Sequence, residues 1–388
     1  MHILKPVFYD AFSCVGSACP FTCCGGWCIT IDEKTRKSYR KMGGQIAKFA
    51  KKKVIYSEQS HSNIVDLRES QGVCPLLNEQ QLCEAVLQKG PEALSRTCRL
   101  YPRRRLSSFD TQEEYLTLGC PRVVQLLLEV QGKLTFILQP DENMNTDNIP
   151  ICNDMLMINL KVRETVADFL QHDEIPFWFR EFYGAYTIEK IGVQIEEKNL
   201  PEVVRKLEQL YTPSFYLAIF DSVKDNKNRE QQFQSLCGLI NGLEDVVAGA
   251  LFPDFYGYSK VIEKMILCNR MCTFEAWDHA RERWLVKKND LHRENIFVYN
   301  WMLGAFTTGN ENELLQNYMA CVLIDVLANH LLILYEIEEE VREELVEVII
   351  CFLVRVFLHG NQHVKDIVKA GMDKKILAPA FLIYLCDI

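Results

Sequence analysis

Apolar and polar residues follow two different patterns along the chain, and the change comes near residue 150. Beyond it, apolar residues recur at helical spacing in long segments whose other positions are charged, which predicts amphipathic helices. We expect these helices at 154–171, 201–211, 214–224, 229–247, 258–271, 275–287, 293–306, 311–335, 338–358 and 362–371. Residues 150–388 are therefore predicted to form an all-α helical domain.

The first 140 residues have shorter and less regular patterns. Residues 27–31 alternate apolar and polar, which predicts a short strand, and Asp32 is placed to cap a helix after it. The segment 33–50 predicts two helical pieces broken at Gly43-Gly44. Further strands are expected at 115–118 and 134–138, with a helix at 122–130 between them. The fold class is thus mainly α, with a loop-rich N-terminal domain at 1–140 and a polar linker that begins at Pro140.

Cysteines are concentrated in the N-terminal domain. Nine of the sixteen fall within the first 120 residues, and five lie between Cys14 and Cys28. The start of the chain lacks the apolar run of roughly 7–15 residues that a secretory signal needs, so we expect a cytoplasmic protein. Thiols stay reduced there, and a cysteine cluster is more often metal-binding or catalytic than a set of disulfides.

Membrane insertion is not expected from the hydrophobic pattern. The two most apolar stretches are 318–335 and 346–358, and both contain polar or charged residues such as Asp325 and Arg355. Neither supplies the roughly 20 uninterrupted apolar residues of a membrane span. We therefore expect no membrane partner.

Charge divides the chain in a similar way. Residues 1–105 carry 17 Lys and Arg against 9 Asp and Glu, whereas the remainder carries 26 against 43. The basic residues gather at 34–53 and 96–105, which could attract a nucleic acid, an acidic protein or an anionic cofactor, or could pack against the acidic part. The chain has no familiar nucleic-acid-binding motif and a net charge of −9, so we expect no nucleic-acid partner.

The cysteine spacing narrows the choice of metal. Structural zinc sites usually contain Cys-x2-Cys pairs, and this chain has none. Adjacent Cys23 and Cys24 suit the iron atoms of a cluster better than one zinc ion. Cys19-x3-Cys23 begins the Cys-x3-Cys-x2-Cys pattern of radical S-adenosylmethionine enzymes, but Gly26 stands at the third position. A polynuclear iron-sulfur site is favoured, with zinc or plain reduced thiols as alternatives.

Two segments carry a resemblance to a known family. They read Phe12-x-Cys14-x4-Cys19-Pro20-x2-Cys23-Cys24-x-Gly26-Trp27-x-Ile29-x-Ile31-Asp32, and then, between residues 74 and 121, Cys74-Pro75-Leu76, Leu82-Cys83, Thr97-Cys98-x2-Tyr101-Pro102-Arg103 and Gly119-Cys120-Pro121. This pattern resembles the flagellin lysine-N-methylases, part of a group named for a CxxCxxCC-type zinc- or iron-chelating domain. A weaker echo lies in Glu294-Asn295-x3-Tyr299-Asn300 and Phe352-x2-Arg355-x2-Leu358-His359.

The resemblance implies an enzyme that transfers methyl groups from S-adenosylmethionine to lysine side chains on the surface of flagellin. It also implies a metal centre, a [4Fe-4S] cluster with zinc as the alternative. The candidate ligands are Cys14, Cys19, Cys23, Cys24, Cys74, Cys83, Cys98 and Cys120. Eight thiols exceed the four that one cluster uses, so some are structural or a second metal is present. A non-enzymatic metal-cluster protein, for redox, metal transfer or nucleic-acid binding, is the rival hypothesis.

A lysine methylase must remove a proton from the target ammonium and align the amine with the methyl group. Tyr101 and Asp325 are candidate proton acceptors; Asp325 and Asn329 lie one helical turn apart and either face a pocket or form an interhelical hydrogen bond. No Gly-x-Gly-x-x-Gly follows a strand, so the mode of cofactor binding is open. An aromatic ring and a guanidinium beside a predicted metal ligand could hold adenine and carboxylate. The candidates are Trp27, Tyr101 and Arg103.

Overall fold

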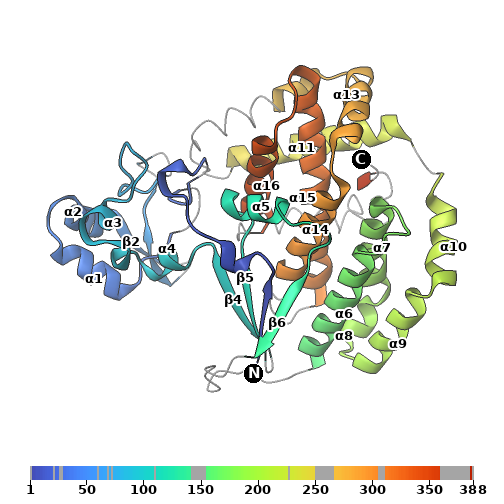
Figure 1. The fold of residues 1–388 in the computed structure, drawn as a ribbon, viewed down its shortest axis with the longest axis horizontal. Coiled ribbons are helices and arrows are strands. Elements are labelled where there is room, and N and C mark those ends of the chain that lie inside the picture. Colours follow the sequence, from blue (N-terminus) through green and yellow to red (C-terminus); the bar gives the residue numbers. More distant parts are fainter. Residues whose placement is uncertain are drawn as a thin grey trace.

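The protein is described by a computed structural model over residues 2–20, 22–25, 29–58, 61–67, 70, 73–108, 111–140, 154–225, 228–249, 266–304, 311–358 and 385–386. A small lobe lies to one side, a four-stranded sheet lies next to it, and a larger body of helices fills the rest (Figure 1). The predicted mainly-α class, with strands confined to the N-terminal part, is confirmed.

The small lobe folds around its own apolar core. Its elements are α1 (Glu33–Lys41), α2 (Gly44–Lys52), β2 (Val54–Ser57), β3 (Ser62–Val65), α3 (Glu84–Lys89), the 3-10 turn η4 (Pro91–Ala93) and α4 (Arg96–Leu100). Asp32 caps α1 as predicted, accepting the Thr35 N–H at 2.9 Å. Gly43 and Gly44 have φ of 77° and 54°, a region that favours glycine, and they separate the two predicted helical pieces. Of the predicted strand at 27–31, Thr30 forms an isolated bridge with Ile64.

The sheet has the strand order β4-β5-β1-β6. Here β1 (His2–Pro6) pairs in parallel with β5 (Thr111–Leu116) and antiparallel with β6 (Phe136–Pro140). The edge strand β4 (Arg103–Ser108) forms a hairpin with β5. The two predicted strands at 115–118 and 134–138 correspond to β5 and β6, and the helix between them is α5 (Pro121–Leu128). The small lobe is therefore inserted between β1 and β4.

Every element that the structure describes beyond β6 is a helix. The helices are α6 (Asp154–Leu170), α7 (Phe177–Lys190), α8 (Gly192–Glu196), α9 (Leu200–Leu210), α10 (Pro213–Val223), α11 (Arg229–Gly249), α13 (Phe274–Lys287), α14 (Asp290–Gly304), α15 (Glu311–Glu338) and α16 (Glu343–Phe357). Residues 266–271 are also helical, whereas the rest of the predicted helix 258–271 and all of 362–371 lie outside the described residues. The helices α7 and α8 were not predicted.

The sheet and the helical body share one hydrophobic core. That core includes Phe8, Tyr115 and Leu127 together with the inner faces of the helices, whereas the core of the small lobe is separate. A buried ion pair crosses the junction, because Arg163 of α6 donates to both carboxylate oxygens of Glu113 of β5 at 2.8 and 2.9 Å. The division of the chain near residues 140–150 stays a prediction, since the linker itself lies outside the described residues.

The central helix α15 is apolar along most of its length. Its segment Leu314–Glu338 is the one described helix that is long and apolar enough to cross a membrane, with a mean hydropathy of 1.8 over its most apolar window. Within the fold, 89% of that window is buried. The neighbouring helices thus cover the apolar surface that a bilayer would otherwise contact.

Candidate functional site

The first cysteines lie on a loop between the sheet and the small lobe. Cys14 is exposed, and its sulfur accepts a hydrogen bond from the Gly16 N–H at 3.5 Å. At the other end of the loop, the Cys24 carbonyl accepts the Cys74 N–H at 2.6 Å, and Gly25 forms a bridge with Val73. This pairing carries the loop against the segment that holds Cys74. All fourteen described cysteines are free thiols, whereas Cys28 lies outside the described residues.

Four of the predicted ligands gather under the core of the small lobe. We name Cys24, Cys74, Cys83 and Cys98 the inner thiol set. Three of them pack against the same apolar cluster, which includes Tyr39, and the charges of Cys24, Cys83 and Cys98 all act on the Cys74 thiol. They arrive from four separate segments, because Cys83 precedes α3 and Cys98 lies within α4.

A second group lies where the loop meets the helical body. We name Cys19, Cys23, Cys120 and Cys351 the bridging thiol set; Cys351 and Arg355 both come from α16. The guanidinium of Arg355 donates to the Gly119 carbonyl at 2.8 Å and to the Thr22 carbonyl at 3.2 Å. Its charge acts on the Cys23, Cys120 and Cys351 thiols.

Hydrogen bonding makes the two adjacent thiols of the loop unlike one another. The Cys23 thiol hydrogen bonds to Cys24, which lowers the pKa of Cys24 to about 7, and the Thr22 hydroxyl and the Arg355 charge act in the same direction. The same hydrogen bond and burial raise the pKa of Cys23. Burial also raises the pKa of Cys98 and of Cys120 to about 11 in each case. Cys24 therefore ionises more readily than Cys23, Cys98 or Cys120.

The two thiol sets are looser than a formed metal site. Among the residues that the structure describes, no three His, Cys, Asp or Glu side chains are grouped closely enough to hold a metal ion. The fold does bring thiols from distant segments together, around Tyr39 in the inner set and around Arg355 in the bridging set. Cys351 is buried and the other seven are half-buried. Binding a metal would require the thiols to converge and to release protons.

The predicted cofactor residues of this region have structural partners. The Tyr101 hydroxyl donates to the Gly119 carbonyl at 2.7 Å, and burial raises the pKa of Tyr101. Arg103 donates to the Phe12 carbonyl at 3.5 Å, and its guanidinium carbon lies 5.0 Å from the centre of the Phe12 ring. Tyr101 thus holds the segment that precedes Cys120, and Arg103 holds the start of the cysteine loop, while their roles toward a cofactor stay predictions. Trp27 lies outside the described residues.

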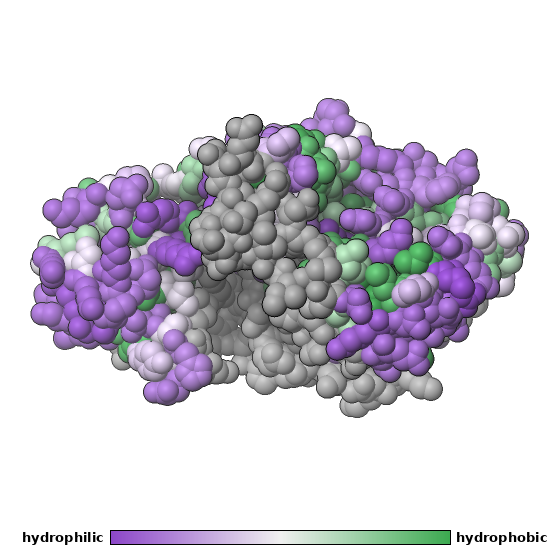
Figure 2. Space-filling view, turned by 90° about the horizontal axis from the view of Figure 1, so that it is seen from below, coloured by the Kyte–Doolittle hydropathy of each residue, from purple (hydrophilic) through white to green (hydrophobic). Residues whose placement is uncertain are grey.

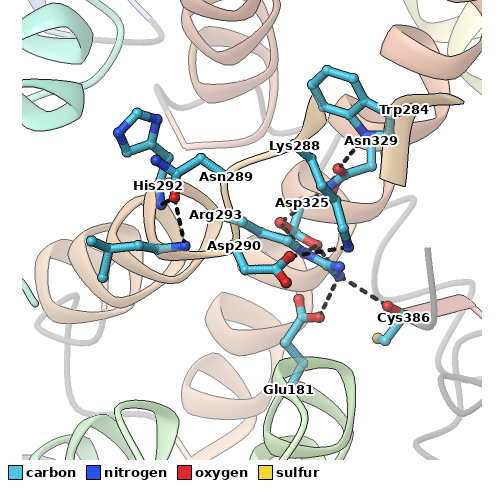
Figure 3. Close-up of polar contacts among 11 residues, drawn as sticks. Glu181, Trp284, Lys288, Asn289, Asp290, His292, Arg293, Asp325, Asn329 and Cys386 are labelled. Atoms are coloured by element: carbon cyan, nitrogen blue, oxygen red, sulfur yellow. Dashed lines mark hydrogen bonds and ion pairs between the residues drawn. The ribbon is translucent and has the colours of Figure 1, made fainter. Parts of the chain in front are cut away.

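A buried charge cluster lies inside the helical body (Figure 3). It consists of Glu181 from α7, Arg293 from α14 and Asp325 from α15. Arg293 binds Asp325 through Nε at 2.9 Å and through Nη2 at 2.7 Å, and the same Nη2 lies 2.7 Å from Glu181. Arg293 also donates to the Cys386 carbonyl at 2.9 Å. Two carboxyl groups therefore share one guanidinium.

Proton binding is favoured at one of these carboxyl groups. Burial and the neighbouring Asp325 carboxylate raise the pKa of Glu181 well above its usual range, although Arg293 opposes them. Glu181 Oε1 is buried and receives no hydrogen bond from the described residues. Because Glu181 Oε1 accepts no hydrogen bond and lies near a second carboxylate, the protonated form of Glu181 is favoured.

A cavity of about 320 Å³ opens beside the charge cluster. Asp325 and Asn329 both line it, so the predicted polar pair does face a pocket. The alternative, an interhelical hydrogen bond, is present as well, because Asn329 of α15 accepts the indole N–H of Trp284 of α13 at 3.1 Å. Within α15, the Asn329 side chain also donates to the Asp325 carbonyl at 2.9 Å. The remaining lining includes several basic side chains, namely Lys287, Lys288, His292 and Arg342.

The two basic stretches of the sequence meet on the surface of the small lobe. A groove of about 930 Å³ runs between α1, η4, α4 and β4. We name it the basic groove; its charged lining comprises Lys34, Lys89, Arg96, Arg99, Arg103 and Arg105 together with Asp32 and Glu92. Figure 2 shows that the surface of the small lobe, at the left of the view, is predominantly hydrophilic.

Comparison with known proteins identifies the family to which the chain is similar. A model of the C-terminal domain of the FliB lysine N-methylases matches residues 163–385, which include the charge cluster and α16. The chain is 36% identical over 129 residues to the flagellar biosynthetic protein FliU of Salmonella muenchen, a match that covers 32% of this chain and 76% of FliU. Lysine-N-methylases of Salmonella typhimurium and Salmonella choleraesuis are also 36% identical over 129 residues, but the match spans only 32% of each. No solved structure gives a significant match.

These matches define the class of the protein as a lysine N-methyltransferase. Within that class, the chain belongs to the FliB lysine N-methylase family, as its cysteine motifs predicted.

The structure also gives a physical reason for the weaker sequence motif in α14, which lies in the matched region. Asn295 accepts the Leu134 N–H at 2.8 Å, and the Tyr299 hydroxyl accepts the Leu116 N–H at 2.9 Å and donates to the Leu116 carbonyl at 2.7 Å. The motif residues fasten the helical body to the sheet.

The sequence interpretation missed several members of the two sites. Glu181, Arg293 and Cys351 were not among the candidates, although Arg293 directly precedes the Glu294-Asn295 motif and Cys351 lies one turn before Arg355. For Arg293, its position next to a recognised motif could therefore have indicated a role in the site. No sequence signal could have indicated Glu181, because its partners are more than 100 residues away along the chain.

Proposed function

We propose that this protein transfers methyl groups from S-adenosylmethionine to the ε-amino groups of lysines on flagellin in the cytoplasm. The observation that carries the proposal is the match of residues 163–385 to the FliB lysine N-methylase family. The proposal that flagellin is the substrate is based on a relative that is named a flagellar biosynthetic protein. The two lysine-N-methylases match over about a third of their length.

The cavity beside Asp325 has the positively charged surroundings that favour the neutral amine required for methylation. A lysine reacts only as the neutral amine, and nearby positive charges favour the neutral form of an amine. Burial and the Arg293 charge lower the pKa of Lys288 in this way, and an incoming lysine would meet the same environment. The Asp325 carboxylate, held in place by Arg293, would then accept the released proton.

The same cavity suits the methyl donor. Its volume of about 320 Å³ falls at the lower end of the range of ligand pockets, about 300–1,000 Å³. Lys288 and Arg342 could hold the carboxylate of S-adenosylmethionine, and the Trp284 ring could contact its adenine. When bound, the cofactor supplies an electrophilic methyl group.

We further propose that the inner thiol set holds a [4Fe-4S] cluster. The support is the donor chemistry, since four thiols are the number that one such cluster uses. The bridging thiol set would then be structural or hold a second metal, with zinc as the alternative. The residues Cys24, Cys74, Cys83 and Cys98 would also cross-link four segments of the small lobe, so removal of the metal is expected to unfold that lobe.

Co-expression with flagellin tests the enzyme. Intact-mass spectrometry of the flagellin is expected to give increments of about 14 mass units per methyl group. Asp325→Asn keeps the shape of the side chain and removes its charge, and we expect it to lower methyl incorporation about 10²-fold or more, the usual contribution of a proton acceptor. The exposed Asp221→Asn on α10 serves as the control. Unmodified lysines across matched flagellins would contradict the proposed function.

Metal analysis of cysteine variants tests the cluster. Purified without oxygen, the parent protein is expected to contain iron and sulfide and to absorb near 400 nm. The double variant Cys74→Ser/Cys98→Ser should lose both, whereas Cys237→Ser/Cys272→Ser, which changes two thiols of the helical body, should retain them. Zinc without sulfide in the parent protein would overturn the iron-sulfur proposal.

A further inference from the structure

We propose that the basic groove binds an acidic segment of the protein substrate, at a distance from the lysine to be methylated. The inference rests on the proposed function and adds a substrate-docking surface to it. Six basic and two acidic side chains line the groove. Five of the six basic side chains come from the two basic stretches that are separate in the sequence, and Lys89 is the sixth.

The two acidic side chains of the groove are already engaged. Asp32 caps α1 and also accepts the backbone N–H of Arg96 at 3.0 Å, and Glu92 pairs with Arg99 at 3.3 Å. In contrast, Lys34, Lys89 and Arg96 are exposed, and none of the three makes an ion pair in the part of the chain that the structure describes. The groove therefore presents positive charge that the protein itself does not neutralise.

The size and lining of the groove suit a peptide. A volume of about 930 Å³ is far larger than a single carboxylate or phosphate group requires. Met42, Ala93 and Leu100 add apolar surface among the charges, and Leu100 is 42% exposed. An extended segment with acidic and apolar side chains would satisfy both parts of this lining.

A polynucleotide fits the surroundings less well. A DNA-binding protein can make about 6–10 phosphate contacts, whereas four cations of the groove lack an ion pair among the described residues, and one of them, Arg103, already contacts Phe12. A strand that continued past the groove would also meet a chain that is acidic beyond residue 105, with 26 Lys and Arg against 43 Asp and Glu. A short acidic stretch of protein avoids both difficulties.

The target lysine itself does not belong in the groove. Its ammonium would be repelled by the same cations, so the groove would hold an acidic segment of the substrate while the lysine enters the cavity beside Asp325. Arg96, Arg99 and Leu100 line the groove, whereas Cys98 on the same helix packs against the core of the small lobe. The bound segment would thus lie one helix away from the inner thiol set.

Peptide binding tests the inference directly. We would measure the fluorescence anisotropy of a labelled, lysine-free peptide of about ten residues that contains four Glu, added to the full chain without a methyl donor. Binding is expected to weaken as salt rises from about 50 to about 300 mM, and a matched Gln peptide should not bind. The variant Lys34→Glu/Arg96→Glu should lose about ten-fold or more in affinity. Both changes fall in the first turn of a helix, where an acidic side chain is favourable, so folding should be preserved.

A charge-matched variant supplies the control. Lys51→Glu/Lys52→Glu changes the net charge equally on an exposed part of α2, outside the groove, and should bind the Glu peptide like the parent protein. Equal losses in the two variants, or equal binding of the Glu and Gln peptides, would overturn the proposal. So would tighter binding of a single-stranded oligonucleotide that the groove variant alone abolishes.

Kinetics distinguish this inference from the proposed function. With a folded protein substrate that carries both the lysine and a separate acidic segment, the groove variant is expected to raise KM and leave kcat unchanged. If no lysine is methylated at all, the proposed function fails, while the anisotropy result still decides whether the groove binds acidic peptides. If methylation proceeds with the same KM in both variants, the docking role fails and the enzyme assignment stands.

Discussion

Replacing Arg355 with alanine is expected to lower the free energy of unfolding by roughly 3–5 kcal/mol. The side chain is 5% exposed and holds the carbonyl groups of Gly119 and Thr22 against α16. Without it, the part-buried Thr22 carbonyl loses this donor and the Gly119 carbonyl retains only the Tyr101 hydroxyl. An unsatisfied carbonyl costs about 1–3 kcal/mol, and the aliphatic part of the side chain no longer fills the junction.

Urea unfolding followed by tryptophan fluorescence would measure this loss. Arg342→Ala, at the exposed start of the same helix, is the control and should change stability by less than about 0.5 kcal/mol. Arg355→Lys should fall between the two, because an ammonium keeps the charge but lacks the planar fork that reaches two carbonyl groups. Coincident unfolding curves for Arg355→Ala and the parent protein would rule out this role for the residue.

Replacing Arg293 with methionine is expected to have a comparable effect, about 3–5 kcal/mol. The change keeps much of the apolar volume but leaves Glu181 and Asp325 facing each other without a cation. Removing one partner of a buried ion pair is more costly than removing the pair, because an uncompensated charge stays buried. Urea unfolding of Arg293→Met beside the exposed control Arg229→Met, on α11, checks this expectation. A loss no larger than that of the control would contradict it.

The raised pKa of Glu181 adds a dependence on pH. In the unfolded chain this carboxyl group ionises near its ordinary pKa of about 4.3, whereas burial and Asp325 keep it protonated in the fold. Its contribution to stability is thus present at low pH and is lost as pH rises toward the folded pKa. Glu181→Gln mimics the protonated form at every pH, so the variant should gain stability relative to the parent protein between about pH 5 and pH 8. Parallel stability profiles over that range would count against a protonated Glu181.

The sequence predicted those elements whose local chemistry is distinctive. Asp32 as a cap, the Gly43-Gly44 break and the amphipathic helices of the body all depend on residues close together in the chain. The structure has the cap, the break and those helices that fall within the described residues close to where they were expected. In contrast, α7 is buried on nearly all sides, from Phe177 to Ile188, so it lacks the polar face that makes a helix recognisable. The edge strand β4 begins with three arginines, which read as a basic patch rather than a strand.

The candidate site was predictable in its residue types but not in its grouping. The spacing of the cysteines could not show which thiols share a neighbourhood, because Cys24 meets Cys98 only after the lobe has folded around Tyr39. In the helical body, Asp325 stood out as a carboxylate in an apolar segment. Its partners Glu181 and Arg293 come from two other helices, and tertiary packing alone brings the three together.

The position of Arg355 also sets an order of events during synthesis of the chain. Gly119 and Arg355 are 236 residues apart, and Thr22 is 333 residues from Arg355. Chains emerge from the ribosome N-terminus first, so Cys19, Cys23 and Cys120 are made long before the helix that covers them. The Arg355 contacts to this loop can therefore form only after α16 has been made, in a chain that extends through Phe357.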